Sequence, residues 1–332
     1  MRLLVTGGAG FIGSNFIRHV LSVHPDDSVV NLDKLTYAGN LQNLADVAAD
    51  PRYRFVHGDI GDGKLVRDLA RGVDAVVNFA ACSHVDRALV EAEEFLRTDV
   101  FGVFTLLEAA RELGISRFVQ ISTDEVYGSL ATGSAREGDP LRPSNPYSAA
   151  KAGADLLALA YWRTHRLPIV ITRSSNNFGP YQYPEKVVPL FITNALDDQP
   201  LPLYGDGRHV REWLYVLDNC EAIDLVLRRG ADGEVYNVGS GHELENIVIT
   251  REILRLADKP ATLVRPVTDR PGHDRRYSLD STKVHRLGWT PRQRFLEGLA
   301  ATVRWYREHE AWWRSLKSGA FATYYQQQYG NR

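Results

Sequence analysis

Tyr147 and Lys151 stand four positions apart in "NPYSAAKAGAD" and could together move a proton. Asn145 is a good helix cap and Pro146 suits a first turn, so we expect a helix from Pro146 to about His165. Residues four apart lie on one face of a helix. The Lys151 ammonium would favour the ionised form of Tyr147, which could then take a proton from a hydroxyl group. A surface pair without function is the alternative, because this spacing is common.

Thr123, Asp124 and Glu125 form a second group that could do chemistry. They directly follow "RFVQIS", which has the pattern of a buried strand. In a doubly wound sheet, ligands bind beyond the carboxyl ends of the strands, so this group should emerge near Tyr147. Two adjacent carboxyl groups can act as acid and base when their surroundings move their pKa values apart. The alternative is that Asp124 or Glu125 only caps a loop.

The elements that would position these groups begin at the first strand. "VTGGAGFIG" places Gly7, Gly10 and Gly13 between a strand and a helix, where small residues let backbone N–H groups approach a pyrophosphate. Glycines at a tight turn also have a purely structural explanation. Asp33, which ends "VVNLD" 20 residues after Gly13, supplies the acidic partner for an adenosine ribose. It would repel a ribose 2′-phosphate and so favours NAD over NADP, although Lys34 beside it weakens that preference.

The first half of the chain alternates short strands with helices. We expect strands in "RLLVTG", "VVNLD", "RFVHGDI", "DAVVNFAA", "RFVQIST" and "PIVITRSS", with helices that start at Ile12 and at about Val90. This alternation predicts an α/β fold with a doubly wound parallel sheet, covered by helices on both faces. Asp59 and Ile60 follow the third strand and could approach an adenine, but Asp59 could equally cap a helix.

The pattern changes beyond Asn177, where proline and glycine separate shorter elements and predict a second, smaller lobe. "EWLYVLDNCEAIDLVLRR" has a helical pattern and "EVYNVGS" a strand pattern, and we expect both to return to the first domain. The predicted cofactor domain is therefore 1–177 with about 211–240, interleaved with a substrate lobe of 178–210 and 241–332. Trp312 and Trp313 lie in a stretch with helical periodicity and are expected to pack rather than bind.

The composition bounds the function. The chain has 332 residues, of which 44% are hydrophobic and 24% charged, and a formal net charge of -2. These values are typical of a soluble globular protein and do not favour nucleic acid as a partner. Cys82 and Cys220 lie far apart without a C-x-x-C spacing, so we expect no disulfide framework and no metal site, and a cytoplasmic location fits. No signal-peptide pattern precedes the first strand, and no run approaches the roughly 20 apolar residues of a membrane helix.

Nine segments spread along nearly the whole chain carry a family resemblance. They are "VTGGAGFIGSNF", "LDKLTYAGNL", "SHVDRA", "STDEVYG", "NPYSAAKAGAD", "SSNNFGPYQYPEKVVPLFI", "PLPLYGDGRHVREWLYV", "YNVGS" and "DRPGHDRRYSLD". Through them the chain resembles the extended short-chain dehydrogenase/reductase family, with a Rossmann domain, and within it the dTDP-glucose 4,6-dehydratases. Related nucleotide-sugar epimerases share the first-domain motifs but generally lack the Asp-Glu pair.

The resemblance implies a three-stage reaction of dTDP-glucose in which NAD is consumed and regenerated. Tyr147 would deprotonate the hydroxyl at sugar carbon 4 as hydride passes to NAD, with Thr123 hydrogen-bonded to that oxygen. Glu125 would then remove the proton on carbon 5 while Asp124 protonates the departing hydroxyl of carbon 6. Hydride return to carbon 6 gives dTDP-4-dehydro-6-deoxyglucose.

The resemblance also implies which residues hold each ligand. Those expected to contact NAD are Gly7, Gly10, Phe11, Ile12, Gly13, Asp33, Lys34, Asp59, Ile60, Phe79, Ala80, Ala81, Thr98, Tyr147, Lys151 and Asn177. Those expected to contact the nucleotide-sugar are Ser83, Thr123, Asn176, Glu185, Lys186, Tyr204, Arg211, Asn237, Arg275 and Tyr325. Arg211 and Arg275 would clamp the diphosphate, Tyr204 would pack near the pyrimidine, and Tyr325 would close over the ligand. A single arginine is otherwise a solvated surface charge.

Several points stay open at this stage. Cys82 stands where the family usually has glutamate, which removes a carboxylate from the nicotinamide vicinity, and Asp99 replaces the usual asparagine. His84 and Arg87 have either a structural or a binding role. The alternatives are another nucleotide-sugar dehydratase, a 4-epimerase or a decarboxylating synthase, whereas an inactive NAD sensor would be expected to lack Tyr147 or Lys151. The resemblance further implies a homodimer, in which the helices of 90–113 and 146–165 could pair with their symmetry mates.

Overall fold

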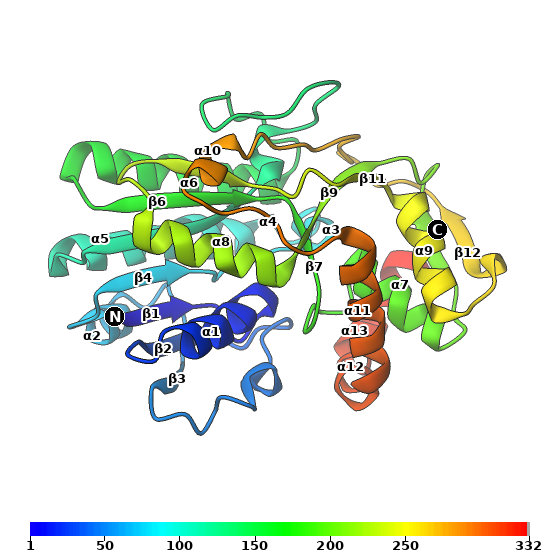
Figure 1. Ribbon diagram of the computed structural model, residues 1–332, viewed down its shortest axis with the longest axis horizontal. Helices are drawn as coiled ribbons and strands as arrows, with labels where there is room; N and C mark the ends of the chain where they lie inside the picture. Colours follow the sequence, from blue (N-terminus) through cyan, green and yellow to red (C-terminus); the bar gives the residue numbers. More distant parts are fainter. Residues whose placement is uncertain (331–332) are drawn as a thin grey trace.

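The computed structural model describes residues 1–330 and has a seven-stranded sheet at its centre (Figure 1). Across the sheet the strands are β10 (Val235–Val238), β6 (Ile169–Ser174), β5 (Arg117–Thr123), β4 (Ala75–Asn78), β1 (Arg2–Thr6), β2 (Ser28–Asp33) and β3 (Tyr53–His57). All neighbouring strands are parallel. The order reverses between β1 and β4, where a crevice forms at the carboxyl ends. The predicted doubly wound α/β fold is confirmed.

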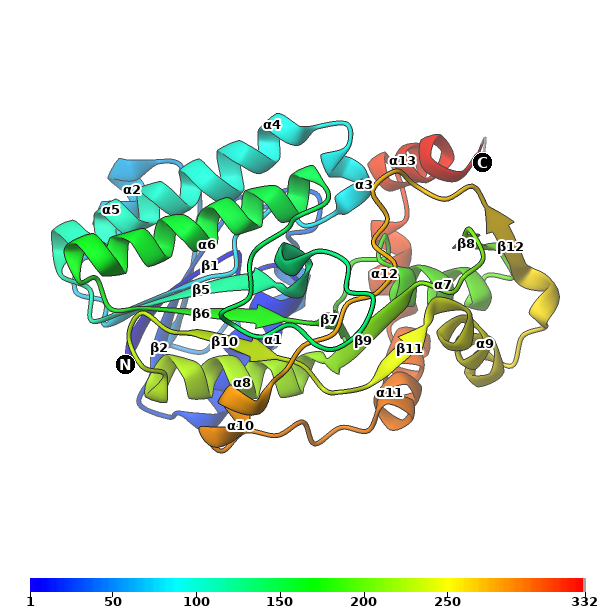
Figure 2. The same ribbon diagram turned by 90° about the horizontal axis from the view of Figure 1, so that it is seen from above.

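Helices cover both faces of this sheet (Figure 2). One face carries α1 (Phe11–Val23) and α8 (Val216–Arg229), and the other carries α2 (Gly63–Ala70), α5 (Val103–Leu113) and α6 (Pro146–His165). Successive side chains of a strand point to opposite faces, so Leu3 and Val5 of β1 are buried in one apolar layer and Leu4 in the other. Burial on both faces explains why these strands are nearly continuous apolar runs.

Helix α6 has the bounds predicted from its sequence. The Asn145 side chain accepts a hydrogen bond from the Ser148 N–H at 3.0 Å, and the Ser148 side chain accepts one from the Asn145 N–H, which completes a capping box. Pro146 occupies the first turn, where its missing N–H costs nothing. These local signals fix the start of the helix that carries Tyr147 and Lys151.

The helix expected from about Val90 to Leu113 is divided into parts. Helix α3 (Val85–Ala88) comes before it, α4 (Ala92–Phe95) leads into a π-helical segment η2 (Leu96–Gly102), and α5 follows. A π-helical turn takes in an extra residue and is frequent at functional sites. Here it lies against α6, so it sits directly behind the predicted catalytic pair.

The helix expected over "EWLYVLDNCEAIDLVLRR" begins later than predicted. Its first four residues belong to β9 (Val210–Tyr215), and α8 starts only at Val216. β9 pairs with β7 (Asn176–Phe178) on one side and β11 (Glu243–Glu245) on the other. Pairing with two distant segments decides the local structure here, which a short apolar pattern cannot reveal. The strand in "EVYNVGS" is β10 and joins the large sheet beside β6.

The remaining elements build a second, smaller lobe, at the right of Figure 1. It contains the sheet β11–β9–β7, the pair β8 (Leu201–Tyr204) and β12 (Val264–Val267), and helices α7 (Val187–Leu196), α9 (Asn246–Ala257), α11 (Phe295–Glu308), α12 (Glu310–Leu316) and α13 (Ala320–Tyr329). Trp312 and Trp313 are buried in the apolar core of this lobe, and the Trp313 indole donates to the Tyr306 carbonyl at 2.8 Å. Their predicted packing role is confirmed.

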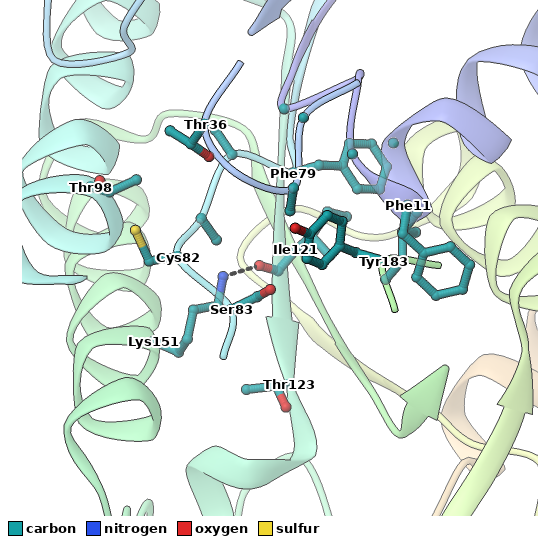
Figure 3. A pocket seen from close by; sticks show the side chains of 18 of the residues that line it. Phe11, Thr36, Phe79, Cys82, Ser83, Thr98, Ile121, Thr123, Lys151 and Tyr183 are labelled. Carbon is teal, nitrogen blue, oxygen red and sulfur yellow. Dashed lines mark hydrogen bonds between the residues drawn. The ribbon is translucent and has the colours of Figure 1, made fainter. Parts of the chain in front are cut away.

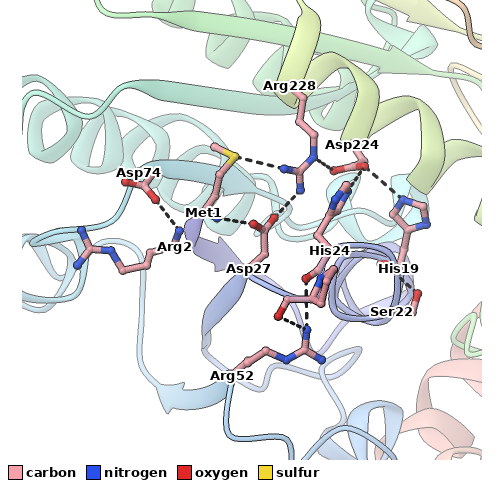
Figure 4. A network of polar contacts seen from close by, with 11 residues as sticks. Met1, Arg2, His19, Ser22, His24, Asp27, Arg52, Asp74, Asp224 and Arg228 are labelled. Atoms are coloured by element: carbon pink, nitrogen blue, oxygen red, sulfur yellow. Dashed lines mark hydrogen bonds and ion pairs between the residues drawn. The ribbon is translucent and has the colours of Figure 1, made fainter.

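A polar network ties α8 to the start of the chain (Figure 4). Arg228 donates to Asp224 at 2.8 Å and also to Asp27, which in turn pairs with the N-terminal ammonium of Met1. His24 contacts Asp224 at 2.7 Å. Burial alone would raise the pKa of Asp224, but hydrogen bonds from both neighbouring histidines and Arg228 outweigh it and hold that pKa well below its ordinary value.

The short elements that complete the chain are η1 (Leu41–Leu44), η3 (Asp124–Tyr127), η4 (Ala261–Leu263) and α10 (Thr282–Arg286). Within residues 1–330, no helix combines the length and the apolar character needed to cross a membrane.

Candidate active site

A cavity of about 290 Å³ opens at the carboxyl ends of the strands, where the strand order reverses (Figure 3). It is lined by every residue predicted to act in catalysis and by every residue predicted to hold the cofactor. Of the predicted substrate residues, it is lined by Ser83, Thr123, Asn176, Glu185 and Lys186. Tyr204, Arg211, Asn237, Arg275 and Tyr325 are not among the residues that line it.

The glycine-rich turn between β1 and α1 leaves no room for side chains. Gly7 has φ +70°, and a Cβ there would lie 2.5 Å from the backbone nitrogen of Ala80. A Cβ on Gly13 would lie 2.5 Å from the Gly7 carbonyl oxygen. Gly10 caps the 13-residue helix α1 without a side-chain hydrogen bond, so the first N–H groups of α1 are free of side-chain partners. Such a helix start suits a pyrophosphate, and the cradle fits a dinucleotide.

Asp33 lies at the end of β2 with its carboxylate held by the backbone. It accepts hydrogen bonds from the Ala9 N–H at 2.9 Å and the Leu35 N–H at 2.8 Å. Burial raises the pKa of Asp33, although these two N–H groups oppose the shift. The fixed carboxylate at the cavity wall has the position expected of a partner for a ribose diol.

Lys34 is engaged by acidic neighbours. Its ammonium lies 2.9 Å from Asp59 and 3.3 Å from Glu94. Helix α2 is capped by Asp62, whose side chain accepts from two backbone N–H groups, so the alternative that Asp59 caps this helix is wrong. Asp59 instead lines the cavity and pairs with Lys34. The Lys34 charge is therefore already compensated by two carboxylates.

The acidic group at the end of β5 is buried. The Thr123 hydroxyl accepts from the Glu125 N–H and donates to Asp124, both at 3.2 Å. One oxygen of Asp124 and one of Glu125 are buried without any hydrogen-bond partner among the described residues. Burial raises the pKa of Asp124 well above its ordinary value, and the nearby Glu125 and Glu212 carboxylates raise it further. Neither carboxyl caps a loop, since Thr123 does so, and the raised pKa of Asp124 favours its protonated form.

The Tyr147 hydroxyl and the Lys151 ammonium both reach the cavity from α6. Lys151 donates to the Ile121 carbonyl at 2.6 Å (Figure 3). Burial raises the pKa of Tyr147 well above 10, and the Glu125 and Asp99 carboxylates raise it further. These protein groups by themselves favour the neutral phenol. That Lys151 and a cationic nicotinamide together stabilise the phenolate stays a prediction.

Two arginines outside the cavity lining have little solvent exposure, since Arg211 is buried and the Arg270 side chain is 16% exposed. Arg211 donates to the Val210 and Asp274 carbonyls, and Arg270 pairs with Asp86 at 2.9 Å. The Nε of Arg270 is buried and has no partner among the described residues. Arg275, by contrast, forms an ion pair with Asp206 at 2.8 Å, and its side chain is 52% exposed. The Arg270 side chain of the same segment is only 16% exposed. The role of Arg275 as a phosphate clamp stays a prediction.

The other predicted substrate residues outside the cavity have partners within the protein. The Asn237 amide donates to the Ala135 carbonyl and accepts from the Tyr127 hydroxyl. The Tyr325 hydroxyl accepts from Asn194 at 3.0 Å. These contacts place Asn237 and Tyr325 in internal networks, and their contact with the nucleotide-sugar stays a prediction. The Tyr204 hydroxyl donates to Asp86. Asp86 also pairs with Arg270, so this carboxylate links Tyr204 to the Arg270 guanidinium.

Arg87 joins three segments that are remote in sequence. Its guanidinium carbon lies 3.9 Å from the Tyr37 ring centre and 4.3 Å from that of Tyr324, and its Nε donates to Glu185 at 3.0 Å. Tyr324 is thus the tail aromatic that contacts Arg87, the partner of the cavity residue Glu185. Burial lowers the pKa of His84, which contacts the same tyrosine, to about 4. No local sequence pattern could have identified this cluster, because only the tertiary fold brings its members together.

His209, Asp269 and His273 are the one group of described residues whose side chains are close enough to suggest a metal site. The two imidazole rings stack with centres 3.7 Å apart and planes 13° apart. An ion bound by an imidazole nitrogen lies near the ring plane, and two parallel planes at this spacing share no such point. Asp269 instead contacts both histidines, at 3.2 and 2.6 Å, so the arrangement is a polar cluster.

Comparison with known proteins identifies the family. A family model described as GDP-mannose 4,6 dehydratase matches residues 4–302. The chain belongs to this dehydratase family. A dTDP-glucose 4,6-dehydratase from Streptomyces niveus is 54% identical over 97% of this chain and 98% of that protein. The family member Agl12 of Haloferax volcanii, named as a low-salt glycan biosynthesis protein, is 56% identical over 92% of this chain and 98% of its own length.

Solved structures of family members agree with this fold. The dTDP-glucose 4,6-dehydratase DesIV from Streptomyces venezuelae, solved with NAD and dTDP bound, has a TM-score of 0.94 and 56% sequence identity. The match covers 96% of this chain and all of that one. The resemblance read from the sequence motifs is therefore confirmed over nearly the full length.

Proposed function

We propose that this protein is an NAD-dependent dTDP-glucose 4,6-dehydratase. The observation that carries the proposal is the pair Asp124 and Glu125 at the end of β5, in the same cavity as Tyr147 and a dinucleotide cradle. The raised pKa of Asp124 favours its protonated form, as the acid of such a pair requires. The similarity to dehydratases from two Streptomyces species, one of them with NAD and dTDP bound, supports the same reaction and the same cofactor.

The cofactor end of the cavity suits NAD rather than NADP. The fixed Asp33 carboxylate would accept hydrogen bonds from the ribose hydroxyls and would repel a phosphate there. Lys34 is already paired with Asp59 and Glu94, so it offers no free charge to a 2′-phosphate. When bound, NAD supplies the acceptor for the hydride of sugar carbon 4 and later returns that hydride to carbon 6.

Tyr147 starts the reaction by taking the proton of the hydroxyl on carbon 4. Its protein surroundings favour the neutral phenol, so the positive charge that stabilises a phenolate comes from Lys151 together with the bound cationic nicotinamide. Oxidation is thereby confined to the complex in which the cofactor is present. Thr123, which lines the same cavity, would hydrogen-bond the carbon 4 oxygen as it becomes a carbonyl.

Elimination then uses the two carboxyl groups in opposite roles. The ketone at carbon 4 acidifies the proton on carbon 5, and Glu125 accepts that proton. Asp124, kept protonated by burial and by Glu125, gives its proton to the hydroxyl leaving from carbon 6. Water departs, and after hydride return a proton is added at carbon 5, so the net change is loss of one water from the sugar.

The diphosphate would be held by cations with little solvent exposure. Arg211 is buried and the Arg270 side chain is 16% exposed, and a phosphate oxygen would satisfy the unpartnered Nε of Arg270. Lys186, whose ammonium donates to the Ser83 carbonyl, lies at the cavity wall between Glu185 and the substrate residues of β7. Asn176 lies there too, with a buried oxygen that lacks a partner within the described residues.

A 4-epimerase is the second candidate function, since it would use the same cofactor cavity and Tyr147. The paired carboxyl groups favour the dehydratase, because epimerisation needs no acid and base for loss of water. The test is incubation of the purified protein with dTDP-glucose, followed by alkali, which gives a 4-keto-6-deoxy product its characteristic absorbance. Formation of dTDP-galactose without that absorbance would overturn the proposal in favour of an epimerase.

We further propose that two copies associate through a face formed by η2, α5 and α6. Large apolar side chains are exposed here, with Phe101 of η2 66% exposed and Leu96 of η2, Phe104 of α5 and Leu156 of α6 also exposed. Two helices from each copy would bury them in a symmetric bundle. Light scattering of the wild type should give twice the chain mass, and Phe101→Ser should lower it. A monomeric wild type would refute the dimer.

Both cysteines are unpaired, which fits a cytoplasmic location.

The two lobes would divide the work of binding. We assign NAD to residues 1–177 together with about 211–240, and the nucleotide-sugar mainly to 178–210 and 241–332. The return of β10 to the large sheet and the packing of α8 on α1 support this interleaved division. β9 departs from it, because it pairs with β7 and β11 rather than with the large sheet.

A further inference from the structure

Asp99 is a carboxyl group buried behind the cavity that the mechanism above does not use. It lies in the π-helical segment η2, and its exposed fraction is 0%. One oxygen accepts a hydrogen bond from the Cys82 N–H at 2.8 Å. The other oxygen is buried and has no hydrogen-bond partner among the described residues. Leaving a carboxylate oxygen in this state is costly, so a compensating charge must lie close by.

That charge comes from the catalytic helix. Segment η2 packs against α6, and a Cβ placed on Gly153 of α6 would lie only 3.6 Å from the Val100 side chain. The ring of Phe95, just before η2, lies edge-on to the Tyr147 ring with centres 6.2 Å apart. The neighbours of Asp99, Thr98 and Cys82, line the cavity (Figure 3). Asp99 thus sits directly behind the wall that carries the reacting groups.

The charged neighbours of Asp99 oppose one another. Burial raises its pKa to about 7, the Lys151 ammonium and the Cys82 N–H lower it, and the Glu94 carboxylate raises it. In turn, the Asp99 charge raises the pKa of Tyr147 on α6 and that of the Cys82 thiol on the loop after β4. Every group that faces Asp99 from a neighbouring element is therefore part of the site or lies at its edge.

We propose that Asp99 is a positioning residue that attracts the Lys151 ammonium from behind the cavity wall and makes the proton acceptance of Tyr147 depend on the ionisation of this hidden carboxyl. When Asp99 is neutral, the Lys151 charge acts fully on Tyr147. When Asp99 is ionised, part of that charge is compensated and a second anion faces the phenolate. Ionisation of Asp99 therefore slows the oxidation step. The ionisation itself transfers only the proton of the Asp99 carboxyl.

The kinetic test compares the wild type with Asp99→Asn, which keeps the shape and the oxygen that accepts from Cys82. The rate of cofactor reduction in a single turnover should be equal in the two proteins near pH 6, where Asp99 is neutral. Near pH 8 the variant should be faster by up to about tenfold, which corresponds to one pKa unit at Tyr147. A structural defect would instead slow the variant at every pH. A ratio that does not change with pH would overturn the proposal.

This kinetic arm rests on the proposed function, whereas a second arm does not. Cys82 lies at the cavity, while Cys220 is fully buried, so alkylation of the native protein by iodoacetamide reports on Cys82. Removing the Asp99 charge should lower the pKa of the Cys82 thiol and speed its alkylation at pH 9 by about three- to tenfold. Cys82→Ser, which should abolish the reaction, identifies the labelled site.

Glu94→Gln is the matched control, because Glu94 also raises the pKa of Cys82 but is partly exposed and paired with Lys34. Screening by water should limit its effect on alkylation to less than about twofold. Faster alkylation in Asp99→Asn without a change in the rate of cofactor reduction would support the effect of the Asp99 charge on Cys82. It would refute the effect of that charge on Tyr147. Unchanged alkylation would refute the ionised, coupled carboxyl itself, whatever substrate the enzyme uses.

Discussion

Replacing Asp124 by Asn should separate elimination from oxidation. The Asp124 side chain is 3% exposed, and burial, Glu125 and Glu212 keep its pKa well above the ordinary value. The raised pKa favours the uncharged form, which Asp124→Asn imitates, and the variant retains the oxygen that accepts from Thr123. The expected change in the free energy of unfolding is below about 1 kcal/mol. What is lost is the proton that Asp124 gives to the leaving hydroxyl.

The size of the effect follows from general acid catalysis, which contributes about a hundredfold to ten-thousandfold. Elimination should slow by that factor, equivalent to about 3–5 kcal/mol in activation free energy. Oxidation at carbon 4 depends on Tyr147 and should change by less than about threefold. In a single turnover with dTDP-glucose, reduced cofactor should therefore accumulate in the variant, seen as its absorbance, whereas in the wild type it should decay as product forms.

Glu125→Gln is the paired variant, since it removes the base rather than the acid. It should also accumulate reduced cofactor, but exchange of the carbon 5 proton with deuterated water should be lost, whereas Asp124→Asn should retain that exchange. Elimination at the wild-type rate in both variants would refute the division of roles. A variant that fails to reduce the cofactor would show that the residue acts earlier, in the oxidation step.

Three further outcomes follow from the structure. Tyr147→Phe should lower the rate of cofactor reduction at least about a thousandfold. The control is Tyr127→Phe, which removes a buried hydroxyl outside the cavity. It should lower the free energy of unfolding by about 1 kcal/mol, measured by thermal unfolding, but keep activity. Gly13→Ala should weaken NAD binding at least about tenfold, measured by calorimetry, because the new Cβ would clash with the Gly7 carbonyl oxygen. In the control Gly153→Ala, the new Cβ would lie 3.6 Å from the Val100 side chain, which is an ordinary contact, so NAD should bind normally. Asp224→Asn should lower the free energy of unfolding by about 1–3 kcal/mol at pH 7 in urea. The pKa of Asp224 is lower in the folded state than in the unfolded state. The stabilisation by ionised Asp224 is therefore full above the unfolded-state pKa near 4 and is lost as the pH falls below that value. The difference in unfolding free energy between the two proteins should shrink at these low pH values.

Local patterns in the sequence were sufficient for much of the fold. The capping residues before α6 and the glycine turn before α1 act within a few positions, so their structural consequences could be read directly. The position of Asp124 and Glu125 after a strand also predicted that both line the cavity, because the carboxyl end of a parallel strand opens onto the crevice. These features depend on neighbours in the chain.

What the sequence could not predict depends on distant parts of the chain. Arg270 and Arg275 are five positions apart in one arginine-rich segment, and only the folded lobe decides that the side chain of the first is 16% exposed and that of the second 52%. Likewise, Tyr324 and Tyr325 are adjacent, and the seating of α13 determines which of them meets Arg87. The start of β9 was mistaken for helix because its pairing partners lie more than 30 residues away.

The central claim is that one hydride leaves the sugar and returns to it at another carbon. It is tested most directly with dTDP-glucose carrying deuterium on carbon 4, by mass spectrometry and NMR of the product. The account predicts that the deuterium appears on the carbon 6 methyl group of the same molecule, with no loss to solvent. Product whose methyl group lacks deuterium, or deuterium scattered between labelled and unlabelled substrate molecules, would contradict it.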